Sequence, residues 1–222
     1  MKIGTKSVLF GAHQFLLHPW FVAAAWTKLY GFPCDPRLWM AFFIHDWGYW
    51  NMPNMDGPEG EEHPWLGARI MGDLFDEILP GIERWGKIAA VCNRIWGFKG
   101  SAYWHNLAFY HSRFMCKRYG AQFSRLCVAD KLAVAFTPWW LYLPMVNLTG
   151  EIHEYMALAE KREGDVARKY SFAFTDTSNQ KRWYLSVQSY LRDWVNEHKD
   201  MRPDTWTPDQ RQEAAVGNGV WK

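Results

Sequence analysis

The sequence predicts an all-α protein, with a single-domain helical bundle over residues 1–199 and a polar C-terminal tail over residues 200–222. Three observations support this prediction. Apolar residues recur at the three- and four-residue spacing of amphipathic helices. Prolines and aspartates precede these apolar segments and glycines follow them, as at the starts and stops of helices. No segment shows the alternating pattern of a half-buried strand.

The first helices can be placed from their prolines, because proline fits the first turn of a helix and disfavours helical geometry in the residue before it. Pro19 and Pro36 each open a predicted helix, with His18 and Asp35 at the respective cap positions. The expected helices span residues 19–30, 36–46, 64–79, 82–96, 105–119, 123–136, 151–162 and 179–199.

Two segments between these helices have a distinct composition. Residues 51–60 are dense in Pro, Gly, Asn and Asp, which predicts a loop, and we expect this loop at the mouth of a site. Residues 139–144 follow Pro138 and predict an aromatic connector. Its rings fit core packing, and they also fit stacking against a base or contact with a membrane surface.

The composition excludes several classes of protein. With 25 basic and 23 acidic residues, the net charge of +2 is too even for a chain that wraps nucleic acid through bulk charge. The four cysteines are widely spaced without a C-x-x-C motif, which argues against a zinc knuckle or a disulfide scaffold. No stretch approaches the roughly 20 apolar residues that cross a bilayer, and polar residues interrupt the basic, apolar start before a signal sequence can form. We therefore expect a soluble, cytoplasmic protein.

One stretch, residues 40–49, places two ionisable side chains, His45 and Asp46, at the end of an apolar helix. A carboxylate beside a histidine in such surroundings needs a partner that offsets its desolvation, and a metal ion is the obvious candidate. Taken alone, the pair is weak evidence, because it also fits a helix-terminal Asp beside a surface His.

Four further groups lie at helix ends or on helices that are otherwise apolar, where an uncompensated imidazole or carboxylate would be costly. They turn the isolated pair into a candidate metal site. The six candidate ligands are His18, His45, Asp46, His63, His111 and Asp130.

The order and context of these residues resemble the HD-domain superfamily of metal-dependent phosphohydrolases. The family pattern is a leading His, a His-Asp pair after an apolar helix, further His residues and a late Asp among small apolar residues. The matching stretches are Phe-Ile-His-Asp-Trp-Gly at 43–48, His-Pro-Trp-Leu-Gly-Ala at 63–68 and Val-Ala-Asp-Lys-Leu at 128–132. The resemblance covers about residues 10 to 136. In two departures, Trp47 follows the pair in place of the frequent Lys, and Ser112 follows His111 in place of a second His.

The resemblance implies that His18, His45, Asp46 and Asp130 coordinate one ion. If a second ion is bound, Asp46 bridges to it and His63 and His111 complete that site. Imidazole and carboxylate ligands suit one or two divalent ions of Mn, Fe, Co, Ni or Zn. The implied activity is hydrolysis of a phosphate ester, in a nucleotide or a small phosphorylated metabolite, by metal-activated water. The alternatives are an HD-type di-iron oxygenase and a non-catalytic nucleotide-binding module.

Other residues are candidates for supporting roles. Asp46 and Glu62 are the catalytic candidates, and Glu62 either passes a proton to the leaving group or stabilises a helix N-terminus. Either His13 or His105 can replace a proposed ligand, although both also fit histidines that orient ligands or simply pack. The basic candidates for substrate binding, each of which also fits a solvated surface charge, are Arg113, Lys117 and Lys131. The sequence leaves homo-oligomerisation open.

Overall fold

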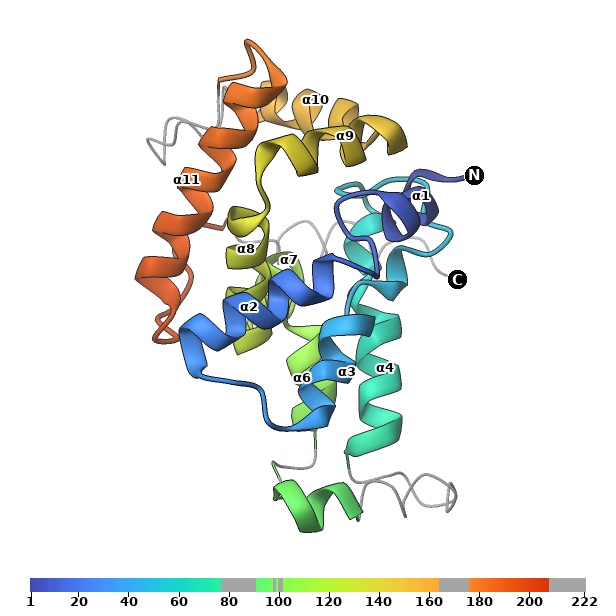
Figure 1. Ribbon diagram of the computed structural model, residues 1–222, viewed down its shortest axis with the longest axis vertical. Coiled ribbons are helices and arrows are strands. Elements are labelled where there is room, and N and C mark those ends of the chain that lie inside the picture. The colour runs from blue at the N-terminus through green and yellow to red at the C-terminus, as the bar shows by residue number, and fades with distance from the viewer. Residues whose placement is uncertain (77–90, 98, 100–101, 164–175, 208–222) are drawn as a thin grey trace.

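The computed structural model describes residues 1–76, 91–97, 99, 102–163 and 176–207, and these residues form helices without strands, as predicted (Figure 1). Two short 3₁₀ segments, η1 and η2, flank the loop predicted over residues 51–60. The elements are α1 (Ile3–Phe10), α2 (His18–Tyr30), α3 (Pro36–Ile44), η1 (Trp47–Tyr49), η2 (Gly60–Glu62), α4 (Pro64–Phe75), α6 (Tyr103–Phe109), α7 (Arg113–Tyr119), α8 (Arg125–Phe136), α9 (Trp139–Thr149), α10 (Glu151–Glu163) and α11 (Gln180–His198). Residues 91–96 are also helical, and the rest of the helix predicted over 82–96 lies outside the described residues.

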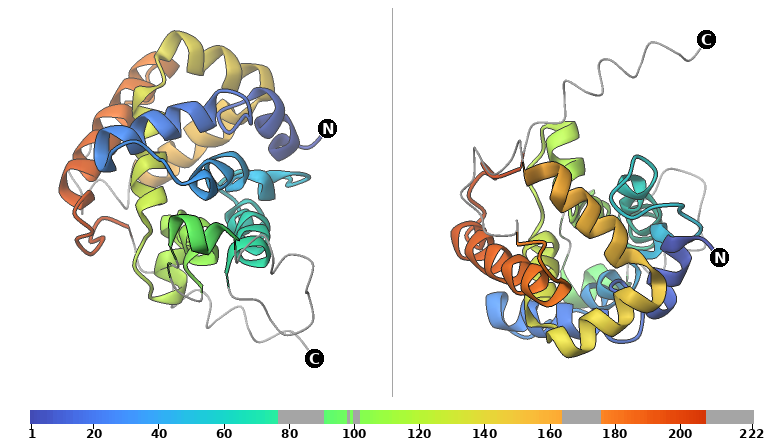
Figure 2. Two further views of the ribbon diagram at one scale, coloured as in Figure 1. Left: turned by 60° about the horizontal axis from the view of Figure 1, so that its bottom comes forward. Right: turned by 90° about the horizontal axis from the view of Figure 1, so that it is seen from above.

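Helix α8 is the centre of the packing, because α2 and α11 both lie against it, while α4 packs against α6. Cys127, Val128, Ala129 and Ala133 of α8 have no exposed surface, as expected of a helix covered on most sides. At one end of the molecule α9 packs on α10, and α1 lies beside α9 (Figures 1 and 2).

The core is filled largely by aromatic side chains. Trp104, Trp194, Phe42 and Phe123 are among its largest members, and each is at most 2% exposed. The small side chains of α8 let these rings approach the helix closely. In the described part of the chain, no helix is both long and apolar enough to cross a membrane.

The starts of the early helices follow the predicted chemistry. The carboxylate of Asp35 accepts a hydrogen bond from the backbone N–H of Arg37 at 3.0 Å, which caps α3. Helix α3 ends at Ile44, two residues earlier than predicted, so His45 and Asp46 lie at its C-terminus and in the following turn. His18 is the first residue of α2 rather than its cap.

The single helix predicted over residues 105–119 is wrong, because the chain breaks between α6 and α7. Ser112 has an extended backbone, and its hydroxyl accepts a hydrogen bond from the N–H of Met115 at 3.3 Å, so it starts a new helix. His111 therefore lies in a turn. The break leaves the three- and four-residue spacing of the apolar residues nearly unchanged, so this spacing does not reveal where one helix ends and the next begins.

The aromatic connector predicted over residues 139–144 is also wrong, since this segment forms the start of α9 with Pro144 inside the helix. Helix α4 ends at Phe75, earlier than predicted. Asp76 follows, and its carboxylate accepts the backbone N–H groups of Trp104 and His105 at 2.9 and 2.8 Å. The Asp76 carboxylate therefore caps the start of α6, and Asp76 does not continue α4.

The first part of the predicted polar tail is attached to the bundle. Asp204 accepts hydrogen bonds from Arg113 of α7 at 3.2 Å and from the indole of Trp194 of α11 at 3.1 Å. Residues 200–207 therefore do not form a loose tail, and residues 208–222 lie outside the described residues.

Candidate metal centre

The six predicted ligands meet at one buried point, although they stand on five separate segments of the chain. Helix ends supply most of them, and α8 supplies Asp130 from its middle. Each of the six residues is at most 6% exposed: His18, His45, Asp46, His63, His111 and Asp130.

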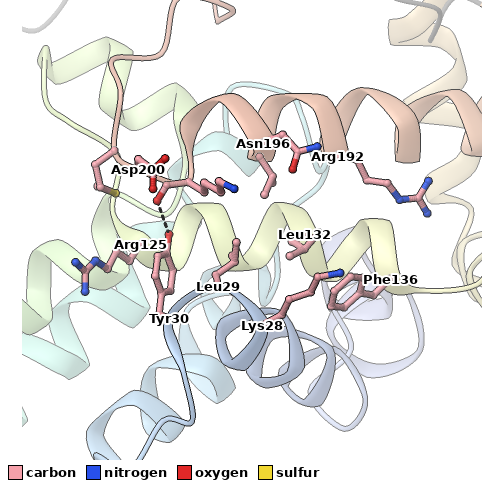
Figure 3. A pocket seen from close by; sticks show the side chains of 12 residues that line it. Lys28, Leu29, Tyr30, Arg125, Leu132, Phe136, Arg192, Asn196 and Asp200 are labelled. Carbon is pink, nitrogen blue, oxygen red and sulfur yellow. Dashed lines mark hydrogen bonds between the residues drawn. The ribbon is translucent and has the colours of Figure 1, made fainter.

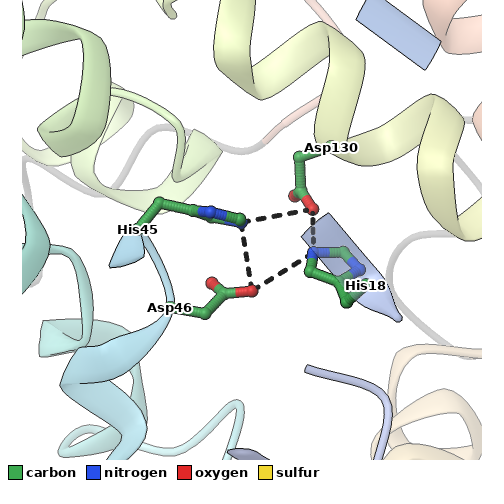
Figure 4. A group of neighbouring side chains, drawn as sticks. All are labelled: His18, His45, Asp46 and Asp130. Atoms are coloured by element: carbon green, nitrogen blue, oxygen red, sulfur yellow. Dashed lines mark ion pairs between the residues drawn. The ribbon is translucent and has the colours of Figure 1, made fainter. Parts of the chain in front are cut away.

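Four of these residues form a first group, in which the ring nitrogens face the carboxylates (Figure 4). Nε2 of His18 lies 3.1 Å from Oδ1 of Asp130 and 3.3 Å from Oδ2 of Asp46. Nε2 of His45 lies 3.1 Å from the same Asp46 oxygen and 3.8 Å from Oδ1 of Asp130. Two ligands about 2.1 Å from one ion and at right or tetrahedral angles are about 3.0–3.4 Å apart. The spacing of this group fits a single divalent ion.

A second group uses the other oxygen of Asp46. Oδ1 of Asp46 lies 3.3 Å from Nε2 of His111 and 3.8 Å from Nε2 of His63. The two carboxylate oxygens of Asp46 thus face different sets of imidazoles, which is the arrangement of a carboxylate that bridges two ions.

Backbone carbonyl groups fix the orientation of three of the rings. Nδ1 of His63 lies 2.7 Å from the carbonyl oxygen of Gly60, and Nδ1 of His111 lies 2.5 Å from that of Ala108. Nδ1 of His45 is 3.1 Å from the carbonyl oxygen of Phe42. A carbonyl oxygen only accepts, so each Nδ1 must carry a proton. Nε2 of His63 and of His111 then presents a lone pair, because the pKa of both rings is lowered, whereas His45 has a raised pKa and must lose its Nε2 proton before it can bind a metal. Metal-binding histidines are oriented in this way.

The contact between His63 and His111 tests whether these residues fit a cation. Their Nε2 atoms lie 3.0 Å apart, and both Nδ1 atoms hold the ring proton. Two lone pairs at this distance repel unless a positive centre lies between them. Three buried atoms of the first group also lack a hydrogen-bond partner in the described part of the chain: Nε2 of His18, Nε2 of His45 and Oδ2 of Asp46. Because buried polar groups normally have partners, the residues present fit a bound metal ion.

The electrostatic environment separates the histidines into two pairs. Burial alone would lower the pKa of His18 and His45, but the neighbouring carboxylates of Asp130 and Asp46 outweigh it and raise the pKa of both rings. Burial dominates at the other pair and lowers the pKa of His63 and His111.

The carboxylates respond in the opposite direction. Burial would raise the pKa of Asp46, but the charge of His45 outweighs it and holds the pKa well below its usual range. The charge of Lys131 has the same effect on the buried carboxyl of Asp130, whose pKa is also lowered. Both carboxylates are therefore ionised at neutral pH.

The backbone segments that carry His45 and His63 approach each other closely at two glycines. A Cβ atom on Gly48 would lie 1.7 Å from the carbonyl oxygen of His63, and a Cβ on Gly67 would lie 2.7 Å from that of Ile44. The ring of Tyr49 stacks on His63 with centroids 4.0 Å apart. Tyr49 is not among the predicted site residues. Its position three residues after Asp46, within residues 40–49, is the sequence signal that could have identified it.

Of the three predicted basic contacts, Lys131 alone borders the centre in the described structure. Its Nζ lies 2.9 Å from Oδ2 of Asp130, and its side chain is 27% exposed. Burial would lower the pKa of Lys131, but the charge of Asp130 outweighs it and raises the pKa. Lys131 therefore remains a cation beside the ligands.

Arg113 and Lys117, the other two predicted substrate contacts, bind the C-terminal segment and α11 in this structure. Arg113 donates to Asp204, to Thr207 at 2.6 Å and to the hydroxyl of Tyr190 at 2.8 Å. Lys117 donates to the backbone carbonyl of Asp204. Both side chains hold the C-terminal segment against the bundle, and their partners are too distant in sequence for helical spacing to reveal them.

Glu62 is likewise engaged elsewhere. One of its carboxylate oxygens pairs with Arg118, and the other accepts the indole N–H of Trp65 at 2.6 Å. This carboxylate belongs to a surface contact between η2 and α7, so its predicted role as a proton donor is not supported.

The two remaining histidine candidates separate clearly. His105 packs on the ring of Phe109 and is not part of either ligand group. His13 lies beside the centre, with its ring centroid 6.0 Å from that of His18 and 4.7 Å from that of Tyr49. Neither histidine replaces a proposed ligand.

An apolar pocket adjoins the segments that carry the ligands. It has a volume of about 470 Å³ and is lined by Val8, Leu9, Phe15, Trp47, Trp50 and Leu66. Trp47 directly follows Asp46, and Leu66 lies one helical turn after His63. The loop over residues 51–60 and the aromatic residues after Pro138 do not line this pocket.

No protein-family model, curated protein or solved structure matches this chain.

Proposed function

We propose that this protein is a metal-dependent phosphohydrolase of the HD-domain type, which cleaves a phosphate ester of a nucleotide or a small phosphorylated metabolite. One observation carries the proposal. Six buried imidazoles and carboxylates from five segments converge around Asp46 in two groups with the spacing of metal ligands, and three of their atoms lack a hydrogen-bond partner in the described part of the chain.

The ligand groups define which residues would hold the ions. His18, His45, Asp46 and Asp130 would hold one divalent ion, and Asp46, His63 and His111 would hold a second. Mixed nitrogen and oxygen ligands suit Mn²⁺, Fe²⁺, Co²⁺, Ni²⁺ or Zn²⁺, among which availability selects. Bound divalent ions supply hydroxide from water at neutral pH and neutralise charge on phosphoryl oxygens.

The pKa shifts and neighbours of the candidate residues bear on this chemistry. His63 and His111 are neutral at pH 7 because burial lowers the pKa of both, so their Nε2 lone pairs are available. His18 and His45 have a raised pKa and must release protons when they become ligands. Lys131 places a positive charge beside Asp130, where a phosphate group can pair with it. The apolar pocket lined by Trp47 and Leu66, which are close in sequence to Asp46 and His63, would accommodate an apolar or aromatic part of the substrate.

The two-sided environment of Asp46 also favours a second candidate, a di-iron oxygenase, because one carboxylate faces two ligand groups. Spectra of protein purified without oxygen separate the two activities. A mixed-valent di-iron signal in electron paramagnetic resonance, together with no phosphate release, favours the oxygenase.

The proposal is tested by elemental analysis and a phosphate-release screen. We expect the protein with Mn²⁺ to hydrolyse an aryl phosphate or a nucleotide, and we expect Asp46→Ala to abolish both metal binding and hydrolysis. Asp73→Ala is the matched control, since Asp73 is an exposed acid on α4, and this variant should keep full activity. Undiminished hydrolysis by Asp46→Ala contradicts the proposal, and metal binding without turnover of any tested substrate favours a non-catalytic binding module.

A further inference from the structure

A groove of about 700 Å³ lies along α8, between α2 and α11 (Figure 3). Helix α8 forms its floor, and α2 and α11 form its two walls. Leu132 of α8 contributes to the floor, whereas Asp130 lies two residues away and so points to the opposite face of the helix. The partly exposed side chains of Leu29, Phe136 and Met201 add apolar surface. The groove is thus separate from the candidate active site.

Basic residues line this groove along its length. They are Lys28 of α2, Arg125 of α8, Arg192 of α11 and Lys199, which directly follows α11, and Asp200 is the one acidic residue in the lining. All four basic residues are exposed, and none takes part in an ion pair with another described residue. An apolar floor between unpaired cations is complementary to a ligand that is apolar on one side and acidic on the other.

The cations are spread out rather than convergent. Arg125 and Phe136, the first and last residues of α8, both line the groove and are about 16 Å apart at a rise of 1.5 Å per residue. A single phosphate group needs donors that converge on one point. The groove therefore fits an extended anion better than a compact one.

The aromatic rings of the groove are already covered. Arg125 lies over the ring of Tyr30 at 5.2 Å, and Lys28 lies over the ring of Phe136 at 5.4 Å. Proteins that bind single-stranded nucleic acid offer open aromatic faces on which bases stack, and these two faces are not open. The same contacts hold the two cations in extended positions above the floor.

From this arrangement we propose that the groove is a docking site for an acidic amphipathic helix of a partner protein. A helix of about eleven residues has the length of the groove. Its apolar stripe would lie on the partly exposed Leu29, Phe136 and Met201, and its Glu or Asp residues would face the cations on both sides. This site goes beyond the proposed hydrolase activity and does not depend on it.

The proposal is tested with a synthetic helical peptide that carries Leu at every third or fourth position and Glu on both flanks. Its binding to the full chain is measured by fluorescence anisotropy at physiological ionic strength, against a scrambled peptide of equal composition, single-stranded oligothymidylate and tripolyphosphate. We expect the amphipathic peptide to bind at least about tenfold more tightly than the scrambled peptide. The double variant Arg125→Glu/Arg192→Glu should lose at least about tenfold in affinity through charge repulsion.

Two further variants keep the test decisive. Lys28→Glu/Lys199→Glu reverses the other two cations and should weaken peptide binding similarly, which covers the case that the first variant folds poorly. Arg69→Glu/Arg182→Glu changes the net charge equally on exposed residues outside the groove and should bind like the parent chain. Equal binding of the scrambled peptide, tighter binding of oligothymidylate or tripolyphosphate, or unchanged affinity in both groove variants overturns the proposal.

Discussion

Asp46 is the residue on which both ligand groups depend, because one of its oxygens faces His18 and His45 and the other faces His63 and His111. The neighbouring residues cannot take over this position. Gly48 has to be a glycine for the His63 segment to approach, and His45 is directed by its own carbonyl contact.

At the same scale, the two ligand groups predict different metal contents for different variants. We expect the parent chain to hold two Mn²⁺ ions, His63→Ala to retain the ion of the first group, and His18→Ala to lose that ion. Metal-to-protein ratios after dialysis measure this, with the exposed His153→Ala as control. A single ion in the parent chain, left undisturbed by His63→Ala, would show that the second group is not a metal site.

Most of the candidate ligands could be predicted from the sequence because they are polar residues at the ends of apolar helices or within them, and such a residue has few explanations other than a buried partner. His63 follows two glutamates instead, and its order in the chain identifies it as a candidate. Arg113 shows the limit of this reasoning. A buried arginine paired with Asp204 and a solvated arginine look alike in sequence, since helical spacing relates only residues within one helix.

At the scale of the elements, the sequence predicts the starts of the early helices better than it predicts a break between two helices or a proline inside one. Asp35 and Pro36 mark a start through local chemistry, which sequence contains. The break after α6 depends on Ser112, whose hydroxyl caps the next helix. Helix α9 continues through Pro144 while it packs against α10 and α1, and such tertiary contacts override local signals.

The contact of α7 and α11 with residues 200–207 predicts a pH-dependent stability. Burial would raise the pKa of Asp204, but Arg113 and the hydrogen bonds from Thr207 and Trp194 outweigh it and lower the pKa to about 2. A carboxyl with a depressed pKa stabilises the fold above its unfolded value of about 3.9, and this contribution is lost as the pH falls toward 2.

Accordingly, Asp204→Asn should lower the free energy of unfolding at pH 7 by about 3 kcal/mol, because it leaves Arg113 without its counter-charge. The difference between parent and variant should shrink between pH 4 and pH 2, as measured by urea unfolding across this range. Asp73→Asn, at an exposed pair, should change little. A parent–variant difference that is constant with pH would contradict the assigned ion pair.

At the scale of the whole molecule, the bundle buries four imidazoles and two carboxylates at one point, and three of their polar atoms lack a hydrogen-bond partner in the described residues. The ion pairs among these groups offset part of the desolvation cost, and a metal ion that bound the folded state would offset more of it.

Metal binding should therefore stabilise the fold. At a free Mn²⁺ concentration of about 100 times Kd, the gain is about 2.7 kcal/mol, which corresponds to a rise in Tm of about 5–10 °C for a chain of this size. Thermal unfolding monitored by circular dichroism measures the rise, and EDTA should reverse it. Asp46→Ala should show no rise, and an equal rise in that variant would place the stabilising ion elsewhere.

The positions of His18 on α2 and Asp130 on α8 also determine when the centre can form during synthesis. A nascent chain that has not yet released residue 130 from the ribosome lacks the last ligand, whatever helices it has already formed. On the proposed assignment, the first ligand group is complete only after α2 has docked on α8, whereas the second group, Asp46, His63 and His111, is already complete before residue 130 emerges.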